Sequence, residues 1–181
     1  MDKLKRVVIT GMGIVSPIGN NKNEVKESLF HNKSGIVFAP KYEEMGFRSQ
    51  VHGEVKINVE NHLEKRDLRF MGNGAAYTAI AMQEAIIDAN LSENLISNPY
   101  TGLVAGSGGP STTNQLLACD IAREKGPKRV GPFMVPKCMS STVSACIATM
   151  FKIKGLNYSI TSACSTSSEV LSEKRVWRML I

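Results

Sequence analysis

One cysteine stands among small hydroxyl residues in the last fifth of the sequence. Cys164 lies in SITSACSTS (159–167), where an apolar, β-branched run ends and Ser162, Ala163 and Ser165 provide room for a sharp turn. At a strand-to-helix corner, such a thiol faces unpaired backbone N–H groups and the positive end of the helix dipole, both of which favour the thiolate. The same N–H groups can stabilise an oxyanion when a thiolate attacks an acyl group. This pattern is typical of a nucleophile for acyl transfer.

The residues alone leave a second interpretation of Cys164 open, because small buried cysteines with no chemical role are common. We predict that structural role for the other three cysteines, which fall in helical or loop-like apolar patterns: Cys119, Cys138 and Cys146. No C-x-x-C pair occurs and no histidine stands at ligand spacing, so the sequence predicts no zinc site. We expect neither a metal nor a cofactor.

The glycines near the N-terminus could suggest a dinucleotide site, since RVVITGMGIVSPIG (6–19) resembles a strand that enters a glycine turn. The required G-x-G-x-x-G spacing fails, because position 16 is Ser and Pro17 would disrupt the start of a helix. No tyrosine has a lysine four residues later, as a short-chain dehydrogenase would need. This interpretation is therefore disfavoured.

Strands and helices are predicted to alternate along the chain. We expect a buried first strand at the start of 6–19, a helix within 21–35, an exposed strand or extended loop at 47–57 and a helix over 67–90. A buried strand over 101–109, helices over 113–124 and 140–153, and a strand that leads into Cys164 complete the pattern. This order predicts an α/β architecture with a largely parallel sheet.

The composition is that of a globular protein, with 43% hydrophobic and 21% charged residues in 181 positions. The net charge is +6 and its basic residues form clusters. Such clusters are usually solvated faces, and the alternatives are an acidic protein partner, nucleic acid or anionic lipid. Nucleic acid is disfavoured because no binding motif accompanies the charges. No apolar run approaches the roughly 18 residues of a membrane span, and we predict a cytoplasmic protein with reduced thiols.

Several segments together resemble the N-terminal half of a β-ketoacyl-[acyl-carrier-protein] synthase of the bacterial type I class. They are RVVITGMGIVSPIGN, RFMGNGAAYTAIAMQEAIIDANL, GLVAGSGG and VGPFMVPKCMSSTVSACIATMFKIKGLNYSITSACSTS. The resemblance implies a thiolase-like α/β fold, of which this chain has the N-terminal half: an incomplete five-layered αβαβα sandwich, normally part of a homodimer. We expect a partial synthase domain over 1–167 and a divergent tail over 168–181.

The resemblance also implies a function, namely fatty-acid chain elongation. Cys164 would take an acyl chain from an acyl-carrier-protein thioester. A malonyl-carrier protein would then decarboxylate, and its carbanion would attack the acyl-cysteine. Gly108 and Met139 would lie near the acyl pocket. The basic patch that docks the acidic carrier protein would comprise Lys65, Arg66, Arg69, Lys128 and Arg129.

Other features depart from the family. Its decarboxylation site uses two histidines and a lysine from the C-terminal half, and His31, His52 and His62 match none of its motifs. The tail SEVLSEKRVWRMLI (168–181) is charged where the family has small, buried residues. It motivates the hypothesis of a truncated or frame-shifted synthase product, which sequencing the locus would test. The alternative function is a non-catalytic remnant that at most binds carrier protein or acylates itself.

Overall fold

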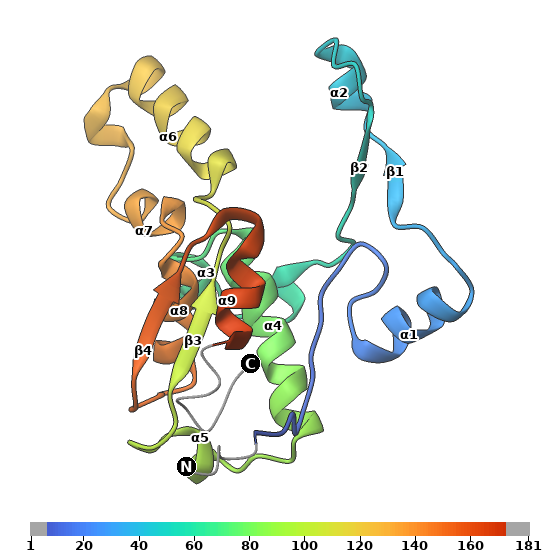
Figure 1. Cartoon of the computed structure of the whole chain (residues 1–181). Helices are drawn as coiled ribbons and strands as arrows, with labels where there is room; N and C mark the ends of the chain where they lie inside the picture. Colours follow the sequence, from blue (N-terminus) through green and yellow to red (C-terminus); the bar gives the residue numbers. More distant parts are fainter. Residues whose placement is uncertain (1–6, 173–181) are drawn as a thin grey trace.

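The computed structural model describes residues 7–172, and its centre is a pair of parallel strands (Figure 1). Strand β3, Leu103–Gly106, pairs with β4, Asn157–Ile160, in a register that runs from Leu103 opposite Asn157 to Gly106 opposite Ile160. Because the strands are parallel, the segments after Gly106 and Ile160 leave the same edge of the sheet. This edge carries the glycine loop on one side and the cysteine motif on the other.

Helices cover both faces of this strand pair. Leu103 and Ala105 face the core that α4, Asn73–Asp88, and α8, Thr142–Met150, form. Gly106 points to the opposite face, where α9, Thr166–Ser172, packs. Both strands contact α8 on one side and α9 on the other (Figure 1). The predicted helix–sheet–helix layering is thus confirmed for this part of the chain.

Small side chains allow α4 and α8 to pack closely. The alanines of α4 at positions 75, 76 and 79 are buried, and Met82 of α4 and Ile147 of α8 have no exposed surface. Residues of this kind are good helix formers and occupy one apolar side of α4. The core therefore lies between these two helices and β3.

The remaining elements lie around this centre. Near the N-terminus are α1, Lys22–Phe30, β1, Ile36–Phe38, α2, Pro40–Glu44, and β2, Val51–Gly53. They are followed by the 3₁₀ turn η1, Val59–Asn61, and by α3, Lys65–Leu68, and α5, Glu93–Ile96. Along the chain, β3 is followed by α6, Thr112–Lys125, by η2, Pro127–Arg129, and by α7, Met134–Cys138, which precedes α8. The 3₁₀ turn η3, Ala163–Ser165, connects β4 to α9.

The prediction of a first strand at the start of 6–19 is wrong, because residues 7–15 pair with no strand among the described residues. The segment instead crosses α4, and its backbone N–H groups bond to carboxylates of that helix. Met12 N–H donates to Asp88 Oδ2 over 3.0 Å, and Ile14 N–H donates to Glu84 Oε2 over 2.9 Å. The β-branched side chains of 7–9 are 47–69% exposed rather than buried.

The predicted helix over 67–90 is interrupted. It forms as α3 and α4, with Gly72 in an extended conformation at the N-cap of α4. A Cβ at Gly72 would lie 3.0 Å from the carbonyl oxygen of Lys137. The close approach of α7 explains why the chain turns here and why glycine stands at this position.

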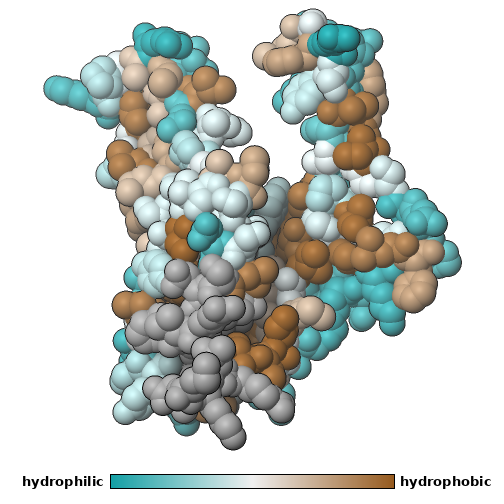
Figure 2. Space-filling model, in the orientation of Figure 1, coloured by the Kyte–Doolittle hydropathy of each residue, from teal (hydrophilic) through white to brown (hydrophobic). Residues whose placement is uncertain are grey.

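Two arms extend from the body in Figure 1. One holds β1 and β2, which pair antiparallel with Val37 opposite His52, so the predicted extended segment near 47–57 contains a short strand. The other holds α6. Figure 2 shows hydrophobic surface along the first arm and near α1, where the exposed side chains include Ile36, Phe38, Val51, Leu29 and Phe30. None of the described helices combines the length and apolarity needed to cross a membrane.

Candidate active site

Cys164 lies at a sharp corner between β4 and α9. The chain leaves β4 at Ile160, passes through η3 and enters α9 at Thr166. Cys164 is exposed, and the preceding Ala163 has φ +47°, a left-handed conformation that is uncommon for a residue with a Cβ. The predicted strand-to-helix corner is confirmed, and the thiol it carries is accessible.

A buried hydroxyl holds this corner. Thr166 is 5% exposed, and its Oγ1 accepts the Ser162 N–H over 2.9 Å and donates to the Ala163 carbonyl over 2.8 Å. Ser165 adds a second link, from its Oγ to the Ser162 carbonyl over 2.9 Å. We call residues 162–166 the elbow. Its backbone is fixed by its own hydroxyl side chains.

The glycine loop after β3 lies against the elbow. A Cβ at Gly108 would lie 3.3 Å from the carbonyl oxygen of Ala163, so the loop approaches the residue before the cysteine closely. Ser107 stabilises the loop by donating its Oγ to the Gly109 carbonyl over 2.7 Å. The structure thus brings Gly108 and Cys164 to the same edge of the sheet.

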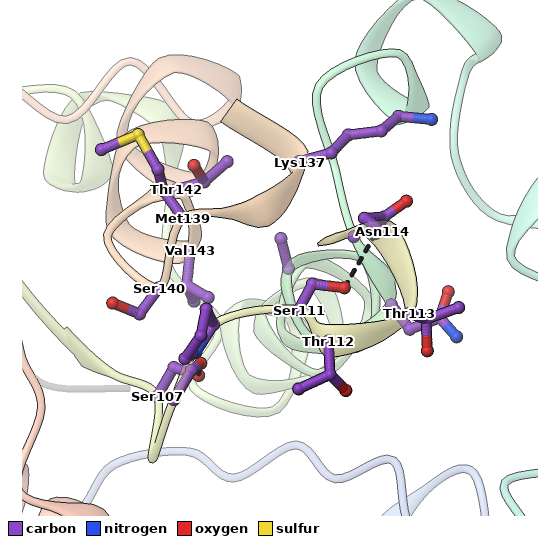
Figure 3. Close-up of a pocket in the computed structure, with 16 residues that line it drawn as sticks. Ser107, Ser111, Thr112, Thr113, Asn114, Lys137, Met139, Ser140, Thr142 and Val143 are labelled. Atoms are coloured by element: carbon purple, nitrogen blue, oxygen red, sulfur yellow. Dashed lines mark hydrogen bonds between the residues drawn. The ribbon is translucent and has the colours of Figure 1, made fainter. Parts of the chain in front are cut away.

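A cavity of about 280 Å³ lies beside this loop (Figure 3). Met139 and Val143 line it from the α7–α8 region, and Ser107 and Gly109 line it from the loop. On the other side, Ser111 accepts a hydrogen bond from Asn114 Nδ2 over 2.8 Å at the start of α6. Met139 therefore lines a cavity next to the glycine loop, and Gly108 lies between two residues of the loop that line it.

The other cysteines differ in their surroundings. Cys138 and Cys146 are half-buried, as their structural role predicts, whereas Cys119 is exposed on α6, which buries none of its residues. The prediction of a core position is wrong for Cys119. Burial, together with the charge of Asp67, raises the pKa of the Cys146 thiol above its ordinary value of 9.0. Cys146 borders a second cavity of about 300 Å³ with apolar walls.

The predicted docking residues fall into two exposed groups. Lys65, Arg66 and Arg69 lie in or next to α3, where Arg66 Nε pairs with Glu64 over 2.9 Å. The Arg69 guanidinium lies 5.1 Å from the centre of the Phe133 ring, which joins this group to the segment before α7. Lys128 and Arg129 lie in η2, which follows the far end of α6 in Figure 1.

None of the three histidines lies in the elbow or in the glycine loop. His31 caps α1 and pairs with Glu27, His52 packs edge-on against Tyr42 in the β1–β2 arm, and His62 follows η1. Between residues 7 and 172, no three His, Cys, Asp or Glu side chains come together as a metal site.

Of the charged residues in the tail, Glu169 in α9 is exposed, whereas Glu173, Lys174 and Arg175 lie outside the described residues.

Sequence reasoning missed Thr166 and the polar wall of the first cavity. The only signal for Thr166 was a hydroxyl residue two positions after the cysteine, which the motif shares with several serines. The cavity wall joins Ser111 and Asn114, at the start of α6, to Lys137 of α7. No local pattern could have placed Lys137 beside the other two.

Comparison with known sequences gives a consistent picture. Residues 4–175 match the family model described as "Beta-ketoacyl synthase, N-terminal domain". The chain is 52% identical over 169 residues to 3-oxoacyl-[acyl-carrier-protein] synthase 1 of Haemophilus influenzae, and 48% identical over 170 residues to that of Escherichia coli K12. Each alignment covers 93% of this chain and 42% of the relative, so the chain spans less than half their length.

Solved structures support the same fold. A β-ketoacyl synthase from Burkholderia phymatum superposes with a TM-score of 0.79 at 22% identity, over 93% of this chain and 42% of the other. The ishigamide ketosynthase/chain length factor gives 0.81 at 22% identity, over 96% and 45%. The fold is thus the thiolase-like α/β fold of these proteins, in its N-terminal part. This chain belongs to the β-ketoacyl synthase family and corresponds to its N-terminal domain.

Proposed function

We propose that this chain contributes the acyl-accepting half of a 3-oxoacyl-[acyl-carrier-protein] synthase that elongates fatty acids. The single observation that carries the proposal is an exposed Cys164 on a rigid elbow within a chain of this family. The thiolate of Cys164 attacks the carbonyl of an acyl-carrier-protein thioester. The carrier thiol leaves, and an acyl-cysteine forms.

The second step joins two carbons to the acyl group. Malonyl-carrier protein loses carbon dioxide, and the resulting carbanion attacks the acyl-cysteine carbonyl. The carbon–sulfur bond breaks, the Cys164 thiolate is released, and a β-ketoacyl-carrier protein forms. We assign no histidine of this chain to decarboxylation, because His31, His52 and His62 match none of the family's motifs. This step is proposed for the whole synthase.

The acyl pocket is proposed at the cavity beside the glycine loop. Met139 supplies an apolar wall there, and Gly108 allows the loop to approach the elbow. A side chain at position 108 would narrow the space between loop and elbow. Selection among acyl groups of different lengths would then depend on the length of this cavity in the assembled protein.

The partner is proposed to be acyl carrier protein, which is acidic. The exposed groups around α3 and η2 supply positive charge for it, and the Arg69–Phe133 contact fixes one guanidinium in place. Surface charges of this kind raise the association rate more than the affinity. One neighbour by structure is a type II polyketide acyl-carrier protein in complex with its ketosynthase, with a TM-score of 0.71 at 15% identity over 93% of this chain and 46% of that one. In the whole protein we expect a homodimer.

The alternative function is a remnant that binds carrier protein or acylates itself without condensing. It is favoured because none of the three histidines matches a motif of the family's decarboxylation site. The test is to incubate the chain and its Cys164→Ala variant with acyl-carrier protein, and then to assay decarboxylation of malonyl-carrier protein. Acylation with decarboxylation supports the synthase, acylation alone supports a half-enzyme, and neither supports a remnant without acyl transfer. We place the activity in the cytoplasm, where a nucleophilic thiol stays reduced.

A further inference from the structure

We propose that Thr166 is a positioning residue: its hydroxyl fixes the backbone of the elbow and so orients Cys164 toward an acyl thioester. The proposal rests on the proposed role of Cys164 as the nucleophile. Thr166 itself does not touch the reacting atoms. It acts through the two residues that precede the cysteine.

The hydroxyl of Thr166 connects both of those residues. It accepts the Ser162 N–H over 2.9 Å and donates to the Ala163 carbonyl over 2.8 Å. Ala163 is held at φ +47°, which is unfavourable for a residue with a Cβ and persists only where surrounding contacts enforce it. The hydroxyl of Thr166 provides such contacts on both sides of the Ala163 backbone unit.

The methyl group of Thr166 anchors the same side chain to β3. A Cβ at Gly106 would lie 2.4 Å from Thr166 Cγ2, so the methyl occupies space that only glycine leaves open. Since Thr166 is 5% exposed, its side chain has little freedom to rotate. The elbow is therefore fixed relative to the sheet as well as within itself.

Two substitutions separate these two contributions. Thr166→Val retains a methyl group toward Gly106 but removes the acceptor for Ser162 N–H and the donor to Ala163. Thr166→Ser retains the hydroxyl and removes the methyl. The Ser162 N–H is part-buried, and a shielded N–H without an acceptor is costly. The valine variant therefore releases the left-handed turn at Ala163, whereas the serine variant preserves it.

The orientation of Cys164 matters more for one reagent than for another. Iodoacetamide is small and requires only an accessible thiolate. An acyl thioester on a carrier protein arrives in a fixed pose, and the thiol must point along the line of attack. Loss of the Thr166 hydroxyl is therefore expected to slow acylation much more than alkylation.

The experiment compares the full chain with Thr166→Val and Thr166→Ser, and uses Thr149→Val as the matched control. The hydroxyl of Thr149 is exposed and bonds only within α8, to the Ala145 carbonyl over 2.8 Å. Three rates are measured: acylation of Cys164 by acyl-carrier protein, alkylation of Cys164 by iodoacetamide, and hydrogen exchange of the Ser162 amide.

We expect Thr166→Val to lower the acylation rate about tenfold to a hundredfold, to change alkylation less than about threefold and to accelerate Ser162 exchange. Thr166→Ser and Thr149→Val retain rates near those of the wild type. Normal acylation of Thr166→Val would overturn the proposal. The proposal would also be overturned if the Val and Ser variants both lost as much alkylation rate as acylation rate, because that pattern indicates a structural role alone.

A wild-type chain that takes no acyl group would refute the proposed function instead. The exchange measurement then decides the role of Thr166 on its own. Faster Ser162 exchange in Thr166→Val but not in Thr166→Ser supports the positioning role, and unchanged exchange overturns it.

Discussion

Gly106 and Thr166 meet where β3 and α9 pack, and the methyl of Thr166 lies in the position a larger residue 106 would need. A Cβ on Gly106 would be 2.4 Å from Thr166 Cγ2 and 2.9 Å from a methyl of Val170. The helix that follows Cys164 therefore rests directly on the backbone of the strand. This contact fixes the elbow relative to the sheet.

Gly106→Ala is expected to destabilise the chain by about 1–3 kcal/mol, because α9 must shift to admit the added methyl group. Urea unfolding followed by circular dichroism measures the effect. Gly74→Ala, in α4, is the control, since a Cβ there meets no atom within 4 Å. It is expected to leave stability unchanged or to raise it. Equal stability of Gly106→Ala and the wild type would show that α9 does not pack on β3 as described.

The contact between residues 12 and 88 predicts a pH dependence. Hydrogen bonding from Lys22 and from the Met12 N–H holds the pKa of Asp88 below its ordinary value of 3.8. Its contribution to stability is therefore present above that value and is lost as the pH falls through the lower folded-state pKa.

Unfolding of the wild type and of Asp88→Asn at several pH values tests this linkage. The wild type should be more stable near pH 6, and the difference should shrink below pH 3.8. Glu93→Asn is a suitable control, because the Glu93 carboxylate forms no ion pair within residues 7–172. A difference that stays constant over this range would contradict the role of the Asp88 charge.

Cysteine labelling should rank the thiols by their surroundings. Burial and the Asp67 charge raise the pKa of Cys146, so iodoacetamide should modify it more slowly than the exposed Cys119 at pH 8. Asp67→Asn removes a negative charge, lowers the pKa of Cys146 and should accelerate its labelling, whereas Asp120→Asn should not. Peptide mass spectrometry gives each rate, and faster labelling of Cys146 than of Cys119 would contradict the described burial.

The carrier-docking proposal predicts an effect that depends on salt. Replacing Lys128 and Arg129 by Glu should slow acylation by acyl-carrier protein about tenfold at low ionic strength, and less as salt rises, because screening weakens steering. Lys33→Glu with Lys41→Glu changes the same amount of charge near the β1–β2 arm and should have little effect. Equal losses in both double variants would indicate a general charge effect rather than docking.

Much of the central architecture could be predicted because its patterns are local. The short segments of β3 and β4, each bounded by a glycine or a turn, and the alanine-rich α4 follow from local patterns, and the small residues around Cys164 indicate its corner. The family resemblance added the roles of Gly108, Met139 and the basic residues, which no local pattern encodes. Their functional roles stay predictions, although the structure places Gly108 against the elbow and Met139 at the cavity.

The failures have physical causes. Residues 7–15 have the composition of a strand, but strand formation depends on a neighbouring strand to supply hydrogen bonds. Here the Met12 and Ile14 N–H groups find acceptors on Asp88 and Glu84 of α4 instead. Thr166 was missed because its importance depends on the left-handed turn at Ala163, which the sequence does not reveal.

The most direct test of the central claim is peptide mapping of the chain after incubation with acyl-carrier protein. Cys119 and Cys164 are both exposed, so Cys119 is an internal control for accessibility alone. We predict a thioester-linked acyl group on Cys164, absent from Cys119 and sensitive to hydroxylamine. An acyl group distributed equally over Cys119 and Cys164, or absent from Cys164, would contradict the assignment of Cys164 as the acyl-accepting nucleophile.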